Sequence, residues 1–240
     1  EDRERLRPMF VMGSSALDEE VPWAAHLAEE VLRETDFSDT ERIRDILGQR
    51  RIAMEQAFAS TGHSAAMARV ASYYLPAGVV REALSGVGFY RFLKELLAHF
   101  DERADELSAK LAGLSRRLFT DGGCTLSFGG DEAALAAFRE ASSPFGGAAA
   151  AAVLTVPAPE DGHEAFVVAS DVTYTACGWD RRLLGEPYGG TWLLASRILS
   201  YDFLWTEVRV KGGAYGAGFQ TTRSGSSRFY SYRDPRIDET

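Results

Sequence analysis

The residues best suited to chemistry in this sequence are an arginine and a tyrosine that lie close together, Arg209 and Tyr215. The pattern around them predicts a guanidinium group on the last turn of a helix and a phenol at the start of a strand. Glycines between and after the pair allow a sharp reversal of the chain and the close approach of another backbone. We therefore predict a site that grips a peptide backbone, formed by Arg209, Lys211, Gly212, Gly213, Tyr215 and Gly216.

A structural interpretation fits the same segment equally well. In that interpretation Arg209 caps the last carbonyls of the helix, and Tyr215 packs in the protein core. The chemistry of the residues leaves both interpretations open.

Zinc-dependent hydrolysis requires at least three histidine, acidic or cysteine ligands around one metal ion. The four histidines are scattered along the sequence, at His26, His63, His99 and His163. His26 comes nearest to a zinc motif, but the inverted pattern H-x-x-E-H would require histidine where Glu30 stands. We predict no metal site in this chain, and we interpret His63 as a structural histidine at a helix start.

Composition and missing motifs argue against several other functions. The formal net charge of -9 argues against a nucleic-acid partner, and the sequence has no apolar run of the length that would span a membrane. Serine-hydrolase, P-loop and dinucleotide signatures are missing from the sequence. The glycine-rich run 212–218 follows a helix and so would face a phosphate with the negative end of the helix dipole. Cys124 and Cys177 are interpreted as unpaired structural thiols.

The first half of the sequence has the apolar periodicity of helices. We expect a capping box at 38–41, breaks at 61–63 and 75–78, and helices over 17–31, 38–58, 64–74 and 89–111. Together these residues predict a helical part over 1–116, which the resemblance described below identifies as the end of a preceding domain.

From about residue 117 the pattern changes to strands and turns. We expect strands near 118–119, 125–128 and 165–176, helices over 132–140 and 188–210, a hairpin of 214–221 with 228–232, and a new helix starting at 234–235. The stretch 142–152 is interpreted as a mobile connection, with a helical alanine run as the alternative. The predicted fold class is α+β: a mostly helical first part, then a domain over 117–240 with an antiparallel sheet and helices on one of its faces.

Several segments resemble the pitrilysin-like (M16) family of inverted-motif zinc peptidases, specifically its presequence-protease branch, which is subfamily C of M16. They are Arg209 with K-G-G-A-Y-G at 211–216, S-Y-R-D-P at 231–235, R-P-M-F at 7–10, S-T-G-H-S-A-A at 60–66, and 92–101. The resemblance spans nearly the whole chain. It implies a clamshell enzyme whose N-terminal half binds zinc through H-x-x-E-H and closes on a C-terminal half of similar fold.

By that resemblance this chain is the C-terminal half, without zinc of its own and inactive by itself. Arg209 and Tyr215 would reach the substrate backbone across the closed chamber and stabilise the tetrahedral oxyanion. The implied partners are an unstructured peptide substrate and the N-terminal catalytic half of the same polypeptide.

Two other functions stay open at this stage. The chain would serve as a non-catalytic peptide-binding or assembly subunit of an M16-type heteromer, or as a free-standing interaction domain. Because the first residue is not Met and Thr240 closes a helix start, we expect both ends to belong to a longer polypeptide. A cytoplasmic location is the default expectation, and the excess of arginine over lysine fits a bacterial source.

Overall fold

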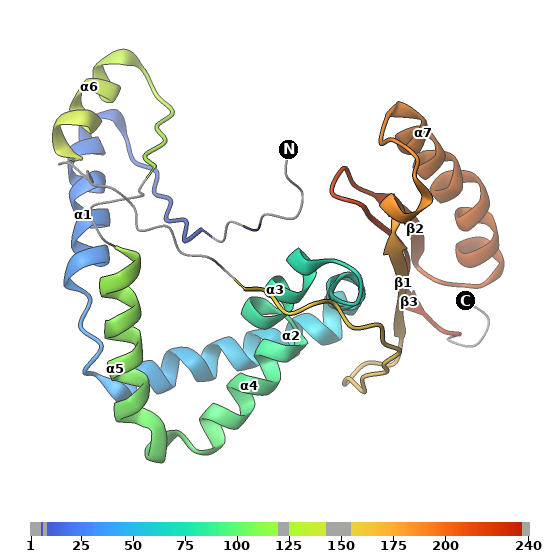
Figure 1. The fold of residues 1–240 in the computed structure, drawn as a ribbon, viewed down its shortest axis with the longest axis horizontal. Helices are drawn as coiled ribbons and strands as arrows, with labels where there is room; N and C mark the ends of the chain where they lie inside the picture. The colour runs from blue at the N-terminus through green and yellow to red at the C-terminus, as the bar shows by residue number, and fades with distance from the viewer. Residues whose placement is uncertain (1–5, 7–8, 120–124, 143–154, 237–240) are drawn as a thin grey trace. The chain divides into compact units, whose positions relative to one another are not determined.

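The computed structural model describes residues 6, 9–119, 125–142 and 155–236. The first part is helical (Figure 1), with η1 (Asp18–Glu20), α1 (Val21–Glu34), α2 (Thr40–Ser72), α3 (Pro76–Ser85), α4 (Val87–Ala98), α5 (Phe100–Leu118) and α6 (Glu132–Ala141). The remainder contains β1 (Thr173–Asp180), η2 (Arg181–Leu184), α7 (Gly190–Ile198), η3 (Leu199–Lys211), β2 (Gly216–Thr221) and β3 (Ser226–Asp234). The expected α+β class, a mostly helical first part followed by an antiparallel sheet, is confirmed.

The chain divides into two compact units. One unit takes in residues 47–98 and the chain from 155 onward, and the other takes in most of 7–46 and 99–154. The predicted division into 1–116 and 117–240 stays a prediction. The candidate site lies wholly within the first of these units.

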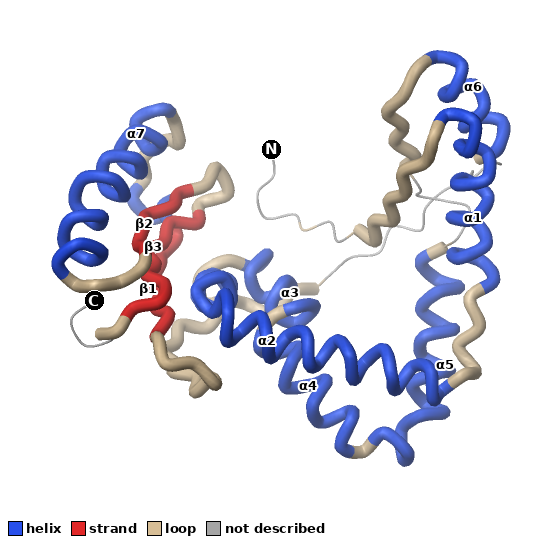
Figure 2. The backbone as a smooth tube through the Cα atoms, turned by 180° about the vertical axis from the view of Figure 1, so that it is seen from behind, coloured by secondary structure: helices blue, strands red, loops and turns tan. Residues whose placement is uncertain are grey.

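The sheet of that unit has three antiparallel strands in the order β1-β3-β2 (red in Figure 2). Tyr230 stands at its centre, paired with Ala176 of β1 and with Gly218 of β2. Side chains of β3 that share a face with Tyr230 meet helix α2, because the hydroxyls of Tyr74 and Ser226 lie 3.0 Å apart. The second half of α2 therefore packs on one face of the sheet.

The predicted hairpin is confirmed as β2 and β3. Its turn contains Gly225 in a left-handed conformation with φ of 103°, a value that a side chain would strain. The carbonyl of Gly225 accepts a hydrogen bond of 2.8 Å from the backbone N–H of Arg181. The turn is thus fixed both by its glycine and by the segment that follows β1.

The free edge of β2 is covered by the long helical element made of α7 and η3. Backbone groups on the edge of a sheet lack a strand partner and need another one. The Ser200 hydroxyl accepts a 3.0 Å hydrogen bond from the N–H of Phe219, and the Ser196 hydroxyl donates a 2.6 Å bond to the Phe219 carbonyl. These two serines hold the helical element along β2, and Arg209 comes near its end.

Three details of the predicted helices are corrected by the structure. The cap of α2 is Asp39, whose carboxylate accepts from the N–H of Arg42 at 2.9 Å, while the Ser38 hydroxyl bonds to Asp36. The expected break at 61–63 shrinks to one non-helical residue, Thr61, inside α2. The predicted helix over 89–111 is two helices, because the backbone turns at His99 with φ of -120° and ψ of 30°. Apolar periodicity continues across such a turn, so periodicity alone does not reveal it.

The predicted strands are partly wrong. Residue 118 ends α5, residues 125–128 form no strand, and β1 begins at Thr173 instead of at 165. Strands require a hydrogen-bonding partner at the right register, and β3 reaches β1 only from Thr173 onward. The helix α6 is confirmed with its cap, Asp131, which accepts from the N–H of Ala134 at 2.7 Å. Most of the stretch 142–152 and the helix expected after 235 lie outside the described residues.

Candidate functional site

Arg209 and Tyr215 lie side by side in the structure. The guanidinium carbon of Arg209 lies 5.6 Å from the centre of the Tyr215 ring and 3.9 Å from that of the Trp205 ring. Arg209 is half-buried, and Tyr215 is 58% exposed. Tyr215 therefore lies at the surface, in contrast to the structural interpretation that placed it in the core.

The glycines between them end the helix and reverse the chain. The N–H of Gly212 donates to the Glu207 carbonyl and that of Gly213 to the Arg209 carbonyl, each at 3.0 Å. Gly213 has φ of 86°, the left-handed conformation that commonly terminates helices. The reversal brings the N–H of Tyr215 to the carbonyl of Arg233 at 3.1 Å, at the start of the hairpin.

The predicted site residues do not all face one cavity. A groove of about 430 Å³ lies beside β2, and of the six predicted residues Arg209 and Gly216 line it. Lys211 is exposed and pairs with Glu207 at 2.7 Å, one helical turn earlier. Gly212 and Gly213 shape the turn behind the groove. Other lining residues include Leu193, Ser196, Arg197, Ser200, Tyr201, Trp205, Ala217, Phe219, Gln220, Tyr230 and Tyr232.

A layer of tyrosines joins this groove to helix α2. The rings of Tyr215 and Tyr232 have centres 5.5 Å apart, and Tyr230 stacks on Tyr232 at 6.4 Å. Behind them the His63 ring lies 4.8 Å from that of Tyr232. Gly62 makes room here, because a Cβ atom at this position would collide with the Tyr174 ring. The kink of α2 and its glycine thus seat a histidine behind the tyrosines.

His63 is therefore an internal residue of α2, not a helix start as the sequence suggested. Its Nδ1 atom is buried and has no hydrogen-bond partner within the described residues. Burial lowers the pKa of His63, because the charged imidazolium would lose hydration that the neighbouring rings do not replace. The alternation of Tyr230 and Tyr232 on one face of a strand was the available signal for this cluster, but their contact with α2 was not predictable.

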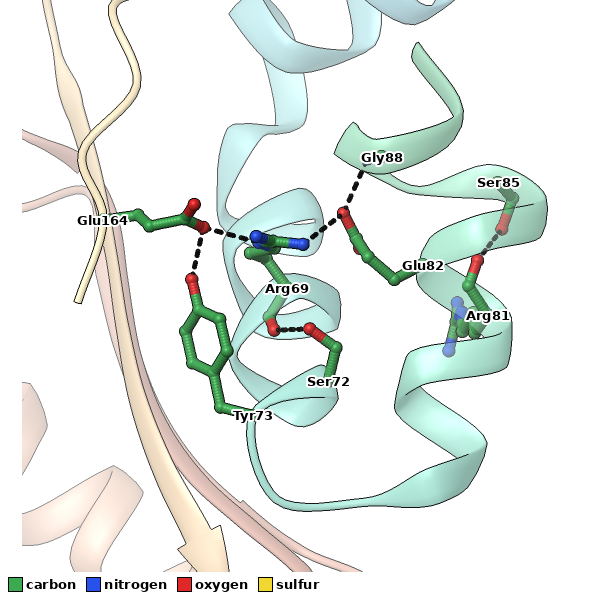
Figure 3. A network of polar contacts seen from close by, with 8 residues as sticks. All are labelled: Arg69, Ser72, Tyr73, Arg81, Glu82, Ser85, Gly88 and Glu164. Carbon is green, nitrogen blue, oxygen red and sulfur yellow. Dashed lines mark hydrogen bonds and ion pairs between the residues drawn. The ribbon is translucent and has the colours of Figure 1, made fainter. Parts of the chain in front are cut away.

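A polar network braces the end of α2 that carries the sheet (Figure 3). Arg69 donates to Glu164 at 2.6 Å and to Glu82 at 3.3 Å, and Glu82 also accepts from the N–H of Gly88 at 2.9 Å. The Tyr73 hydroxyl donates to the same oxygen of Glu164. Hydrogen bonds from Arg69 and Tyr73 lower the pKa of Glu164. The network ties the segment before β1 to α2 and to the start of α4.

The described residues do not fit a catalytic zinc ion. No three His, Cys, Asp or Glu side chains gather as ligands would in residues 9–119, 125–142 and 155–236. None of the helices in these ranges combines the length and the apolar character that crossing a membrane requires. Cys177 is an exposed free thiol on β1, and Cys124 lies outside the described residues.

Comparison with known families decides the relationship of this chain. The family of regions associated with M16 peptidases of subfamily C matches residues 1–96, and the family described as "PreP C-terminal domain" matches residues 163–240. The chain is related to the subfamily C peptidases of M16 and corresponds to their C-terminal region. Both matches agree with the family resemblance noted at Arg209, 211–216 and 231–235.

Named relatives support the same placement of this M16-related chain. It is 30% identical to Protein HypA of Clostridium perfringens over 98% of the chain and 24% of that protein. It is 30% identical to the mitochondrial presequence protease of Yarrowia lipolytica over 96% of the chain and 24% of that protein. It is 29% identical to presequence protease 1, chloroplastic/mitochondrial, of Arabidopsis thaliana over 88% of the chain and 20% of that protein. The chain thus spans about a quarter or less of the length of these relatives.

Proposed function

We propose that this chain is the non-zinc-binding part of a zinc metallopeptidase that degrades unstructured peptides, in which Arg209 and Tyr215 hold the substrate backbone. The observation that carries the proposal is the adjacency of these two side chains at the groove beside β2. The relatives named as presequence proteases are consistent with a peptide substrate.

The chemistry of the pair suits a developing oxyanion. The guanidinium group of Arg209 and the hydroxyl of Tyr215 are both hydrogen-bond donors, and the Arg209 charge is permanent at physiological pH. Donors aimed at a carbonyl oxygen that becomes negative stabilise the transition state more than the ground state, and more strongly once water is excluded. Because Tyr215 is largely exposed, closure of a further part of the protein over it would supply that exclusion.

The floor of the groove suits an extended peptide. Gly216 and Gly218 lie beneath the rings of Tyr232 and Tyr230, where a Cβ atom on either glycine would collide with the ring above it. These glycines thus let the tyrosines lie flat against β2, next to Arg209. A peptide backbone held by Arg209 would then run along an aromatic surface, which contacts many sequences without selecting strictly among them.

The zinc ion would be held by residues in another part of the polypeptide, the catalytic half, which is the proposed partner of this chain. Its role would be to activate the water that attacks the peptide bond. The residues described here contribute binding, orientation and charge stabilisation.

The test is peptide hydrolysis by the full-length protein and its variants. Arg209→Ala and Tyr215→Phe should each lower kcat/KM by about 10²- to 10³-fold, the loss typical of removing one oxyanion donor. Zinc content and thermal unfolding should match the wild type, since Tyr215 is exposed and Arg209 half-buried.

Unchanged turnover in both variants would refute the role of the pair. If the full-length protein binds unstructured peptides but does not cut them, the alternative of a non-catalytic peptide-binding or assembly subunit holds in place of the enzyme. A cytoplasmic location stays a prediction for this chain, and fractionation of cells that express the full-length protein would check it.

A further inference from the structure

The groove beside β2 has an unusual charge for this protein. The chain carries a formal net charge of -9, yet the described lining of the groove contains two arginines, Arg197 and Arg209, and no aspartate or glutamate. An acidic protein that keeps carboxylates away from one arginine-lined groove presents a local positive potential there. That groove favours an anionic group on whatever binds to it.

Both arginines are held by aromatic rings instead of by carboxylates. The guanidinium carbon of Arg197 lies 5.8 Å from the centre of the Tyr201 ring, and its Nη1 atom donates to the Tyr201 hydroxyl at 3.4 Å. Arg209 lies over Trp205 and Tyr215. Within the described part of the chain neither arginine makes an ion pair. A ring orients a guanidinium group but leaves its N–H donors open to a ligand.

The wall between the two arginines is apolar and accessible. Tyr201 is 64% exposed and Trp205 is 41% exposed, and both line the groove. Arg197, Tyr201, Trp205 and Arg209 follow one another at intervals of one helical turn along α7 and η3, so they form a single strip. A ligand that lies along this strip meets a cation, two rings and a second cation.

We propose that this groove is a specificity subsite for peptides that carry an acidic side chain, recognised by Arg197, beside the backbone segment held by Arg209. The inference rests on the proposed function, because it assigns Arg209 to the backbone and leaves Arg197 free for the side chain. Apolar side chains next to the acidic one lie against Tyr201 and Trp205. Arg197 is a binding residue in this scheme and takes no part in the chemical step.

The experiment compares two labelled peptides that differ in one residue, glutamate or glutamine, flanked by leucines. Binding to the full-length protein is measured by fluorescence anisotropy in EDTA, so that zinc-dependent cleavage does not consume the peptide. The wild type should bind the glutamate peptide about two- to fivefold more tightly, the range of an accessible ion pair. Added salt should reduce that preference.

Arg197→Gln should remove the preference while the glutamine peptide binds as before, and Arg197→Lys should restore part of it. The matched control is Arg81→Gln, because Arg81 is an exposed arginine of α3 that does not line this groove. The control should keep the wild-type preference. Equal binding of both peptides by the wild type, or an equal loss for both in Arg197→Gln, overturns the inference.

Failure of the inference and failure of the proposed function have different signatures. If Arg209→Ala abolishes cleavage but Arg197→Gln leaves the preference intact, the proposed function stands and the subsite is refuted. If Arg197→Gln removes the preference but Arg209→Ala leaves cleavage unchanged, the subsite stands and the proposed role of Arg209 fails.

Discussion

The guanidinium carbon of Arg209 lies 3.9 Å from the centre of the Trp205 ring, which belongs to the same helical element one turn earlier. A cation over a tryptophan face is stabilised by about 0.5–2 kcal/mol. Trp205 therefore directs Arg209 toward Tyr215, although the sequence pattern around Arg209 gave no sign of this.

Replacing Trp205 should weaken catalysis through Arg209. We expect Trp205→Ala to lower kcat/KM for peptide hydrolysis by about two- to tenfold, and Trp205→Phe to retain part of the activity, because phenylalanine offers a weaker cation–π surface. The matched control is Trp23→Ala, since Trp23 is 61% exposed on α1. Equal activity of Trp205→Ala and wild type would show that Arg209 is oriented by something else.

Two glycines of helix α2 should respond in opposite ways to alanine. Gly62→Ala should destabilise the protein by about 1–3 kcal/mol, because its new methyl group meets the Tyr174 ring. Gly48→Ala should stabilise it by about 0.5–1 kcal/mol, since no atom lies within 4 Å of a Cβ at this position and alanine favours the helix. Urea unfolding of the two variants measures both values. A gain of stability in Gly62→Ala would contradict the packing of Tyr174 against α2.

The ion pair between Arg69 and Glu164 should appear in the acid branch of the stability curve. The folded protein lowers the pKa of Glu164 below its usual value of 4.5 through hydrogen bonds from Arg69 and Tyr73. The resulting stability is present above the usual pKa and is lost as pH falls below it. Glu164→Gln should lower stability at neutral pH and flatten the loss below about pH 4.5. The exposed Glu95→Gln should leave the curve unchanged, and an identical curve for Glu164→Gln would disprove the effect.

His63 should affect stability in a higher pH range than Glu164. Burial among Tyr174, Tyr230 and Tyr232 lowers the pKa of His63 below its usual value of 6.5. The unfolded chain therefore takes up this proton before the folded one does, and stability falls as pH drops below about 6.5 toward the lowered pKa. His63→Phe should remove that part of the decline in urea unfolding between pH 7.5 and 5. His26→Gln, a change at an exposed histidine, serves as the control and should follow the wild type; a His63→Phe curve that also follows it would refute the assignment.

Features that depend on a few neighbouring residues could be predicted from the sequence. The reversal at Gly213 and the turn at Gly225 both use left-handed glycines, and the cap at Asp131 uses a short acidic side chain. These conformations are set by steric limits and hydrogen bonds within one turn of the chain. For the same reason the adjacency of Arg209 and Tyr215 was predictable, because a short glycine-containing reversal joins them.

Strand limits and helix breaks were less predictable. β1 begins at Thr173 because β3 pairs with it from there, and the helices divide at His99 although apolar residues continue on both sides. Apolar periodicity reports which residues become buried, and it does not report where hydrogen-bonding partners end.

The sequence by itself determined the α+β class, the hairpin and the pairing of a helix-end arginine with a strand tyrosine. The tertiary structure alone decided that His63 lies behind Tyr232 and that Arg197 shares a groove with Arg209 across from β2. His63 and Tyr232 are far apart in the sequence, and they meet because α2 packs on the sheet. Such contacts depend on how whole elements bury their faces together, and no short stretch of residues encodes that arrangement.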